Sequence, residues 1–155
     1  MIRINIGGTS KQIADLSALL KANPVKNPNP GDFEPDGSWY SMLAVGDALF
    51  AVEANHGELD MITTDGVVTR VADISDTQGH VVPTVMAYYG NFYVGELQTF
   101  QPDASAELLK ITKAGLVSSF ATGITTLPGS ASDAAPRLSY LRRVSGRDLP
   151  APCPR

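Results

Sequence analysis

A length of 155 residues suits a single domain with a sizeable core, and 43% hydrophobic against 18% charged residues is a globular composition. The formal net charge of -4 argues against a nucleic-acid-binding protein, because phosphate binding depends on clustered Lys and Arg. No apolar run reaches the roughly 18 residues of a membrane helix, and the first residues lack the features of an export signal. We therefore expect a globular chain that binds neither nucleic acid nor membrane.

Three stretches of the chain repeat one pattern: a short apolar run, a Gly-containing turn and a second apolar run. Residues 4–16 align without a gap on residues 62–74, and these align in turn on residues 111–122. Each copy is typical of a β-hairpin. A second type of hairpin occurs at residues 41–50 and 84–93, so the two types alternate along the chain.

The two alternating hairpins together make a four-stranded repeat. Equivalent hairpins are separated by 58, 49 and 43 residues, which is typical of β-propeller blades of about 40 to 50 residues. The sequence therefore predicts an all-β fold, a partial β-propeller of four-stranded antiparallel blades with about two and a half blades.

The repeats also predict the domain organisation. Residues 1–128 form the propeller portion, in which residues 2–16 supply only the outer hairpin of a blade. Residues 17–37 are a connection rich in Pro and Asn, where no regular structure beyond one helical turn is expected. Residues 38–75 and 81–124 each make a complete blade. The strands expected in the first complete blade lie near residues 39–45, 48–53, 59–63 and 67–74.

The last part of the chain, residues 129–155, differs in composition from the repeats. Residues 1–135 contain five Lys, two Arg and fifteen acidic residues, whereas residues 136–155 contain five Arg, no Lys and one acidic residue. This Arg/Pro-rich tail is expected to be poorly ordered. One hypothesis is a basic interaction tail. The other, which we prefer, is that this stretch is translated in a reading frame that differs from the ancestral one. Its single cysteine, Cys153, has no partner for an internal disulfide.

Three segments carry a resemblance to a known family. They read PDGSWYSM at residues 35–42, VEANHGELD at residues 52–60 and TQGHVVPT at residues 77–84. In these segments the chain resembles the ScyD/ScyE family of bacterial β-propeller proteins, and the resemblance covers residues 2–128. Family members are similar to NHL-like and gluconolactonase-like propellers, are commonly longer and usually carry an export signal. Because the first half-blade begins abruptly and the tail departs from the repeat pattern, we expect an internal portion of a longer propeller. The resemblance implies no established reaction.

The connections between strands of an antiparallel blade alternate between two edges of the sheet. Tight turns share one edge, at residues 46–47, 64–66, 90–91 and 113–115. Longer polar connections share the other edge, at residues 17–37, 54–58, 75–80 and 95–107. Because rigid scaffolds concentrate function on long loops, we expect a site for a protein or small-molecule ligand on the long-loop edge.

Seven polar residues are candidates for this site: Glu53, Asn55, His56, Glu58, Gln78, His80 and Glu96. Glu53 and Glu96 occupy equivalent positions in successive blades, and such carboxylates can hold a divalent cation such as calcium. A nearby His can act as acid or base. In the alternative, preferred interpretation, His56 is a solvated turn residue and His80 caps a backbone group.

Other conspicuous residues have structural interpretations. Gly7-Gly8-Thr9-Ser10-Lys11 suggests a phosphate loop, but it aligns with the turn at residues 65–69 and is predicted to be a turn between strands. Gly66 and Gly115 are expected to need positive φ. Four aromatic residues are expected to fill the core between blades rather than to stack on a ligand: Trp39, Tyr88, Tyr89 and Phe92.

Three hypotheses for function follow. The first is a non-enzymatic binding or scaffold module of the β-propeller type. The second is a metal-dependent, lactonase-like or lyase-like propeller enzyme that uses the acidic and histidine residues. The third is a truncated or frameshifted product without activity. Because an incomplete propeller leaves open strand edges, self-association is expected as well.

Overall fold

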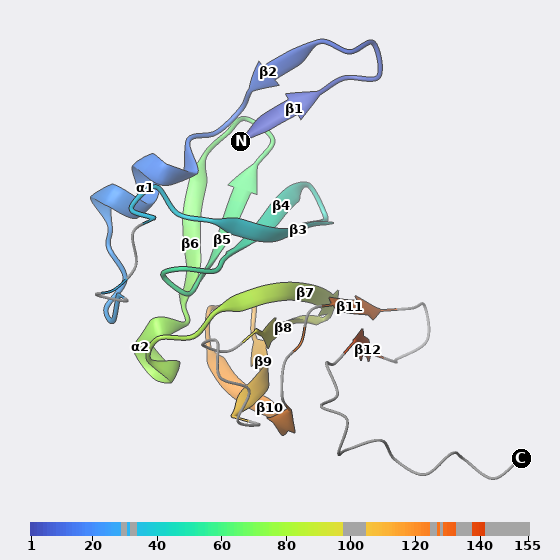
Figure 1. Cartoon of the computed structure of the whole chain (residues 1–155). Coiled ribbons are helices and arrows are strands. Elements are labelled where there is room, and N and C mark those ends of the chain that lie inside the picture. Colours follow the sequence, from blue (N-terminus) through green and yellow to red (C-terminus); the bar gives the residue numbers. More distant parts are fainter. Residues whose placement is uncertain are drawn as a thin grey trace, which may run out of the picture.

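The computed structural model describes residues 1–28, 31, 34–97, 105–124, 127, 129–132 and 138–141. Antiparallel strands dominate it, and two short helices accompany them (Figure 1). This confirms the expectation of an all-β chain built of antiparallel four-stranded sheets. No helix in the described part of the chain is both long and apolar enough to cross a membrane.

The strands group into two four-stranded and two two-stranded sheets (Figure 1). The first sheet has the order β3 (Trp39–Val45), β4 (Ala48–Glu53), β5 (Glu58–Thr63) and β6 (Val68–Asp73). The second sheet has the order β7 (Pro83–Tyr89), β8 (Asn91–Glu96), β9 (Ala106–Ile111) and β10 (Val117–Ile124). The first hairpin pairs β1 (Ile2–Ile4) with β2 (Ser10–Gln12), and the last hairpin pairs β11 (Gly129–Ser132) with β12 (Leu138–Leu141).

The strands β3 and β4 begin and end at the expected residues, and β5 and β6 differ from expectation by one residue at their ends. The helix α1 (Leu16–Ala22) is longer than the single turn expected. It is stabilised because the Asp15 side chain accepts a hydrogen bond from the Ala18 backbone N at 3.1 Å, an N-cap contact. Its residues Leu16 and Leu20 are buried, so tertiary packing adds to the cap.

Two further segments differ from expectation. Helix α2 (Ser75–Gln78) forms where a loop was expected. In the tail, which was expected to be poorly ordered, β11 and β12 pair over four residues each, and neither strand contains an Arg or a Pro. The remainder of the tail, residues 133–137 and 142–155, lies outside the described residues, and so does most of the connection at residues 95–107.

The two four-stranded sheets pack face to face through one apolar core. Phe50, Val52 and Leu59 of the first sheet meet Phe92 and Val94 of the second. The rings of Phe50 and Phe92 lie with their centroids 4.5 Å apart. Burial of such a layer supplies the main stabilisation of the stacked sheets.

The expected aromatic core is correct in part. Phe92 is fully buried, Tyr88 packs on it with ring centroids 4.9 Å apart, and Trp39 packs on the other side of the first sheet with the N-terminal segment. Tyr89, by contrast, is 52% exposed, so its assignment to the core was wrong. It is the last residue of β7, and the pleat turns successive side chains to opposite faces.

Each sheet turns the same face toward the unit that precedes it. Leu59 packs between the two sheets, while Leu108, its equivalent in the repeat, packs on the far side of the second sheet against Leu127. Ile62 packs backward against the N-terminal segment, while its equivalent Ile111 packs backward against the first sheet. Successive units are therefore stacked head to tail, an arrangement that leaves two different outer faces.

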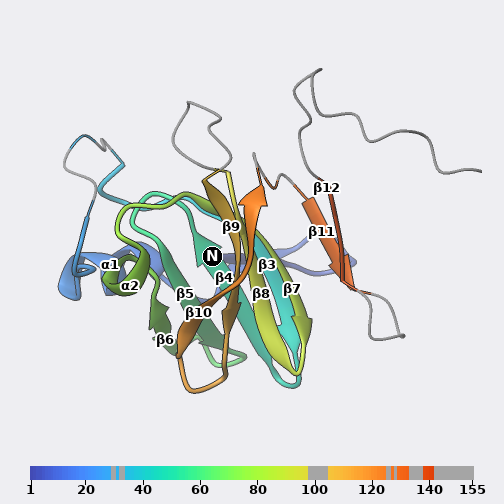
Figure 2. The ribbon, with the colours of Figure 1, turned by 90° about the horizontal axis from the view of Figure 1, so that it is seen from below.

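The tight turns of the two four-stranded sheets lie at one edge of the stack and the longer connections at the other (Figure 2). Two of these turns and the β1–β2 turn have the same hydrogen bonds. In the β5–β6 turn, Thr63 N donates to Val67 O at 2.9 Å and Gly66 N donates to Thr63 O at 3.0 Å. The same two bonds close the turn around Gly115, at 3.0 Å each, and the β1–β2 turn around Gly8, at 2.9 and 2.8 Å.

The glycines of these three turns have positive φ, with values of 93° at Gly66, 82° at Gly115 and 79° at Gly8. This confirms the expected conformation of Gly66 and Gly115, and it shows that residues 7–11 form the end of the β1–β2 turn and the start of β2. A Cβ atom at Gly66 would overlap the carbonyl oxygen of Ile13, and one at Gly115 would overlap that of Val71. Since Ile13 and Val71 are equivalent in the aligned repeats, this close approach recurs at each step of the stack.

A β-bulge accompanies this contact. The pairing register of β6 on β5 shifts across Val71, and that of β10 on β9 shifts across Phe120, the equivalent residue. A bulge bends the strand and redirects its backbone groups. The bulge at Val71 therefore occurs at the residue whose carbonyl group contacts the Gly115 turn of the following sheet.

Candidate functional site

The structure separates the seven candidate residues into three groups. Glu53, Asn55, His56 and Glu58 surround the β4–β5 turn, Gln78 and His80 lie at and after α2, and Glu96 ends β8. Within the described residues, no hydrogen bond or ion pair links Glu53 to His80 or Glu96. The expected convergence of all seven side chains is therefore not found among the polar contacts of the described residues.

Glu53 is fully buried and shapes the β4–β5 turn. Its Oε1 accepts hydrogen bonds from the backbone N of Ser38 at 2.6 Å and of Asn55 at 3.1 Å. Its Oε2 accepts one from the backbone N of His56 at 2.6 Å and lies 3.4 Å from His56 Nδ1. Charge-assisted bonds to backbone N–H groups are strong, so both oxygens are committed to holding this turn.

The turn is also tied to the connection that precedes β3. The Asn55 amide donates to Glu34 Oε2 at 2.6 Å, and the Ser38 hydroxyl donates to the same oxygen. These two hydrogen bonds, first that of Ser38 and then that of Asn55, hold the pKa of Glu34 below its usual value. The long-loop edge of the first sheet is thus a fixed polar surface.

A cluster of three carboxylates lies on one side of the first sheet, and we call it the acidic cluster: Glu53, Glu58 and Asp60. All three are fully buried. Glu58 pairs with Glu53 across β4 and β5, and Asp60 follows it on the same face of β5. This face is the one that packs against the N-terminal segment.

Two donors partly satisfy the acidic cluster. Arg70 Nε donates to Glu58 Oε2 at 2.5 Å, and Trp39 Nε1 donates to Asp60 Oδ2 at 3.0 Å. Arg70 Nη2 also donates to the backbone oxygen of Asn23, the residue that follows α1. Through Arg70, the acidic cluster therefore joins the end of α1 to β5 and β6.

The electrostatics of the cluster follow from its burial. Burial raises the pKa of Glu58 to about 8, with a further rise from the charge of Asp60 and an opposing effect from Arg70. Burial also raises the pKa of Asp60 to about 6, against the hydrogen bonds from Trp39 and Glu58. Since two adjacent buried carboxylates do not both ionise readily, this pair retains a proton at neutral pH. A protonated carboxyl is a general acid, but Glu58 and Asp60 are both fully buried.

Sequence reasoning found Glu53 and Glu58 but missed Asp60, Arg70 and the polar role of Trp39. The signal was the alternation of Glu58 and Asp60 along one strand, which places both side chains on one face. The continuous apolar character of the neighbouring strands concealed it. Arg70 lies opposite Asp60 in the neighbouring strand, a register that the sequence alone does not specify across a bulge.

The remaining candidates lie in the second sheet and in the connection before it. Glu96 is buried, and its Oε2 accepts a hydrogen bond from the Glu107 backbone N at 3.3 Å, while its Oε1 has no partner among the described residues. Burial raises the pKa of Glu96 to about 7. His80 Nδ1 is buried without a partner, again within the described residues, and the Gln78 amide donates to the Thr77 hydroxyl at 3.4 Å.

The proposed calcium ligands do not form a recognisable metal site in the described residues. No group of three or more His, Cys, Asp or Glu side chains in that part of the chain is arranged to hold a metal ion. Both oxygens of Glu53, one of the two expected ligands, are occupied by backbone N–H groups.

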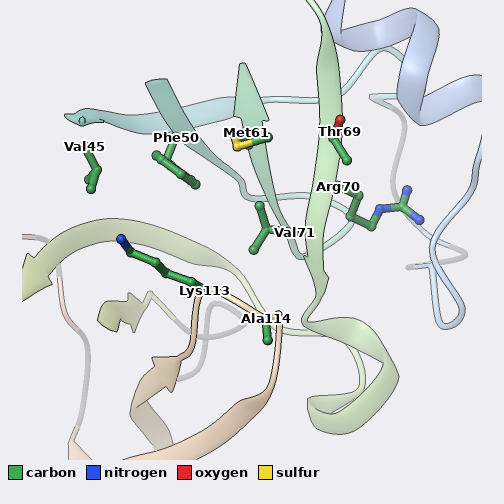
Figure 3. A pocket seen from close by; sticks show the side chains of 8 residues that line it. All are labelled: Val45, Phe50, Met61, Thr69, Arg70, Val71, Lys113 and Ala114. Atoms are coloured by element: carbon green, nitrogen blue, oxygen red, sulfur yellow. The ribbon is translucent and has the colours of Figure 1, made fainter. Parts of the chain in front are cut away.

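Among the cavities lined by described residues, two lie at the tight-turn edge. One of about 450 Å³ lies between the sheets, where Val45, Phe50 and Val71 face Lys113 (Figure 3). The Arg70 side chain points away from it (Figure 3). Another cavity of about 320 Å³ lies between the first hairpin and the first sheet. Both cavities mark junctions between successive units, at the edge where the sequence predicted no site.

Comparisons of this chain with protein-family models, with curated proteins and with solved structures found no match. Functional inference therefore depends on the residues and the geometry described above.

Proposed function

We propose that this chain is a binding or scaffold module of the β-propeller type, related to the ScyD/ScyE proteins, which recognises a protein or small molecule on its long-loop edge. The repeat of about 40 to 50 residues, the meander order of both four-stranded sheets and their head-to-tail stacking support the propeller arrangement. The fixed polar surface around the β4–β5 turn supports the place of the ligand site.

The observation that favours binding over catalysis is the environment of Glu53. A carboxylate that acts as base, nucleophile or metal ligand needs an oxygen free for the substrate or the ion. Glu53 uses both oxygens to hold backbone N–H groups, and Glu58 and Asp60 are enclosed. These acids therefore fix the shape of the long-loop edge.

The test uses melting temperature and product formation with the same probes: neutral monosaccharides, sugar lactones and calcium chloride. A binding module should melt at a higher temperature with a probe and leave the probe unchanged. Asn55→Ala should reduce that rise because it alters the long-loop edge. Thr64→Ala is the matched control, because Thr64 is an exposed polar residue in a tight turn of the same sheet.

The runner-up, a lactonase-like or lyase-like enzyme, has one observation in its favour. Glu96 has an unpartnered oxygen within the described residues and a pKa raised to about 7, and carboxyls that titrate near neutral pH are frequent in active sites. Consumption of a lactone above the uncatalysed rate, abolished in Glu96→Gln, would establish this alternative and overturn the binding proposal.

A further inference from the structure

The two hairpins outside the four-stranded sheets correspond to opposite halves of such a sheet. The β1–β2 turn repeats the hydrogen bonds of the β5–β6 and β9–β10 turns, so the first hairpin corresponds to the outer half. β11 lies beside β7, as β7 lies beside β3 (Figure 1), so the last hairpin corresponds to the inner half. Together they contain the four strands of one complete sheet.

The strands that join the two halves of a complete sheet are β4 with β5, and β8 with β9. Their counterparts in the two hairpins are β12 and β1, and in the described part of the chain each of these pairs on one side only. Ile4 of β1 is 73% exposed, whereas its repeat equivalents Ile62 and Ile111 are fully buried. The apolar face of the first hairpin therefore lacks the sheet on which its equivalents pack.

The turn glycine of the first hairpin also lacks the contact that its equivalents make. The turn glycine of each complete sheet lies against a backbone carbonyl of the preceding unit, but no atom lies within 4 Å of the Cβ position at Gly8. The equivalent carbonyl at the opposite end of the stack belongs to Phe120, which has the same bulge as Val71 and is 54% exposed. The Gly8 turn and the Phe120 bulge thus have the features of two halves of one repeated contact.

We propose that a second copy of this chain completes the sheet: β12 of one copy pairs with β1 of the other, in the strand order β11-β12-β1-β2. This position also brings the Gly8 turn of the second copy onto the Phe120 bulge of the first. The pairing of β12 with β1 and the contact of the Gly8 turn with the Phe120 bulge therefore require the same position of the β1–β2 hairpin of the second copy. The new interface continues the contact that already joins the first hairpin, the first sheet and the second sheet.

Because the two ends of the stack differ, this contact is head to tail, and such contacts form either closed rings or open filaments. Two copies joined at both ends contain four internal and two shared four-stranded sheets. Six sheets lie within the range of about 4 to 8 blades in closed propellers, so we infer a closed dimer. The ring closure rests on the propeller arrangement proposed above, whereas the pairing of the hairpins does not.

The first test measures the mass of the 155-residue chain by light scattering over a range of concentrations. The expected species has twice the 16.4 kDa mass of one chain. Gly8→Asn should raise the dissociation constant by about ten-fold or more, which corresponds to about 1.4 kcal/mol, because Asn tolerates positive φ but adds atoms at the carbonyl contact. Gly90→Asn is the matched control, since Gly90 also has positive φ with nothing within 4 Å.

The second test follows amide hydrogen exchange of Ile2 to Ile4 at concentrations below and above the dissociation constant. Pairing with β12 should slow the exchange of these edge amides, and Gly8→Asn should restore fast exchange without changing the far-ultraviolet circular dichroism. A single 16.4 kDa species at every concentration, or a dimer unaffected by Gly8→Asn, would refute the pairing. Open assemblies of increasing length would refute ring closure alone. Neither result bears on ligand recognition, which the lactone and melting assays test separately.

Discussion

The two four-stranded sheets use the same backbone arrangement with different chemistry on the face that each turns toward the preceding unit. In the first sheet this face contains Asp60 and Arg70, and in the second the aligned residues are Leu109 and Ser119. Leu109 belongs to the apolar core between the sheets, whereas Asp60 belongs to the acidic cluster. The comparison shows that the repeat folds without charged residues at these two positions.

The polar or apolar character of each face matches the part of the chain that covers it. The second sheet is covered by another sheet, and an apolar layer suits that neighbour. The first sheet is covered by α1 and the N-terminal segment, and Arg70 joins Glu58 to the backbone that follows α1. Because buried ion pairs add little net stability relative to apolar packing, we infer that this network determines where α1 lies.

The largest expected effect comes from breaking this network. Arg70→Met should destabilise the protein by about 3 to 5 kcal/mol at pH 9, because the buried Glu58 loses its cationic partner and must either stay ionised or bind a proton at high pH. Urea unfolding measures the change. Ser119→Met, the aligned substitution in the second sheet, should have a much smaller effect. Equal effects in the two sheets would contradict the role assigned to the network.

Backbone contacts, unlike the charge network, are shared by the two sheets, so changes there should have equal effects. Gly66→Val and Gly115→Val should each destabilise the protein by about 1 to 3 kcal/mol, the range of strained backbone, and the overlap with the carbonyl of the preceding unit adds to this cost. Gly46→Val is the control for strain alone, since Gly46 has positive φ and open space around it. Unchanged urea midpoints in the first two variants would show that the turns tolerate the larger residue.

The acidic cluster should also give the first sheet a pH dependence. The pKa of Glu58 rises from 4.5 to about 8 on folding, so its contribution is complete below pH 4.5 and is lost as the pH rises through 8. Glu58→Gln should therefore remove a fall in the free energy of unfolding between pH 5 and pH 8, whose slope for one titrating group is at most about 1.4 kcal/mol per pH unit. Glu96, whose pKa is raised to about 7, contributes in the same direction, so Glu58→Gln should leave part of the slope and the double variant with Glu96→Gln should leave less.

The smallest expected effect concerns α1. Asp15→Ala removes the side chain that caps this helix and should cost about 0.5 to 1 kcal/mol. Amide exchange in α1 should rise more than exchange in β9, because the helix covers only the first sheet. If exchange rose equally in both places, the helix and the second sheet would unfold as one unit.

The sequence predicted the repeated parts of this molecule well because period and turn chemistry are local properties. Hairpins at residues 41–50 and 62–74 and the positive φ of Gly66 follow from the repeated apolar runs and from glycine placement. The acidic cluster was predicted only in part, because the contact of Arg70 with Glu58 depends on how β6 pairs beyond its bulge. The role of Glu53 was also missed, since three backbone donors converge on it only after the turn has formed.

The same contact, between a turn glycine and the carbonyl group of a bulged residue, joins each four-stranded unit to the unit before it. A unit that has the glycine on one side and the bulge on the other can follow any unit of the same kind, whatever its loops contain. Gene duplication therefore has a ready means of lengthening such a stack, because an added copy needs no new contact to be invented. The loops at the opposite edge can then diverge without disturbing this contact.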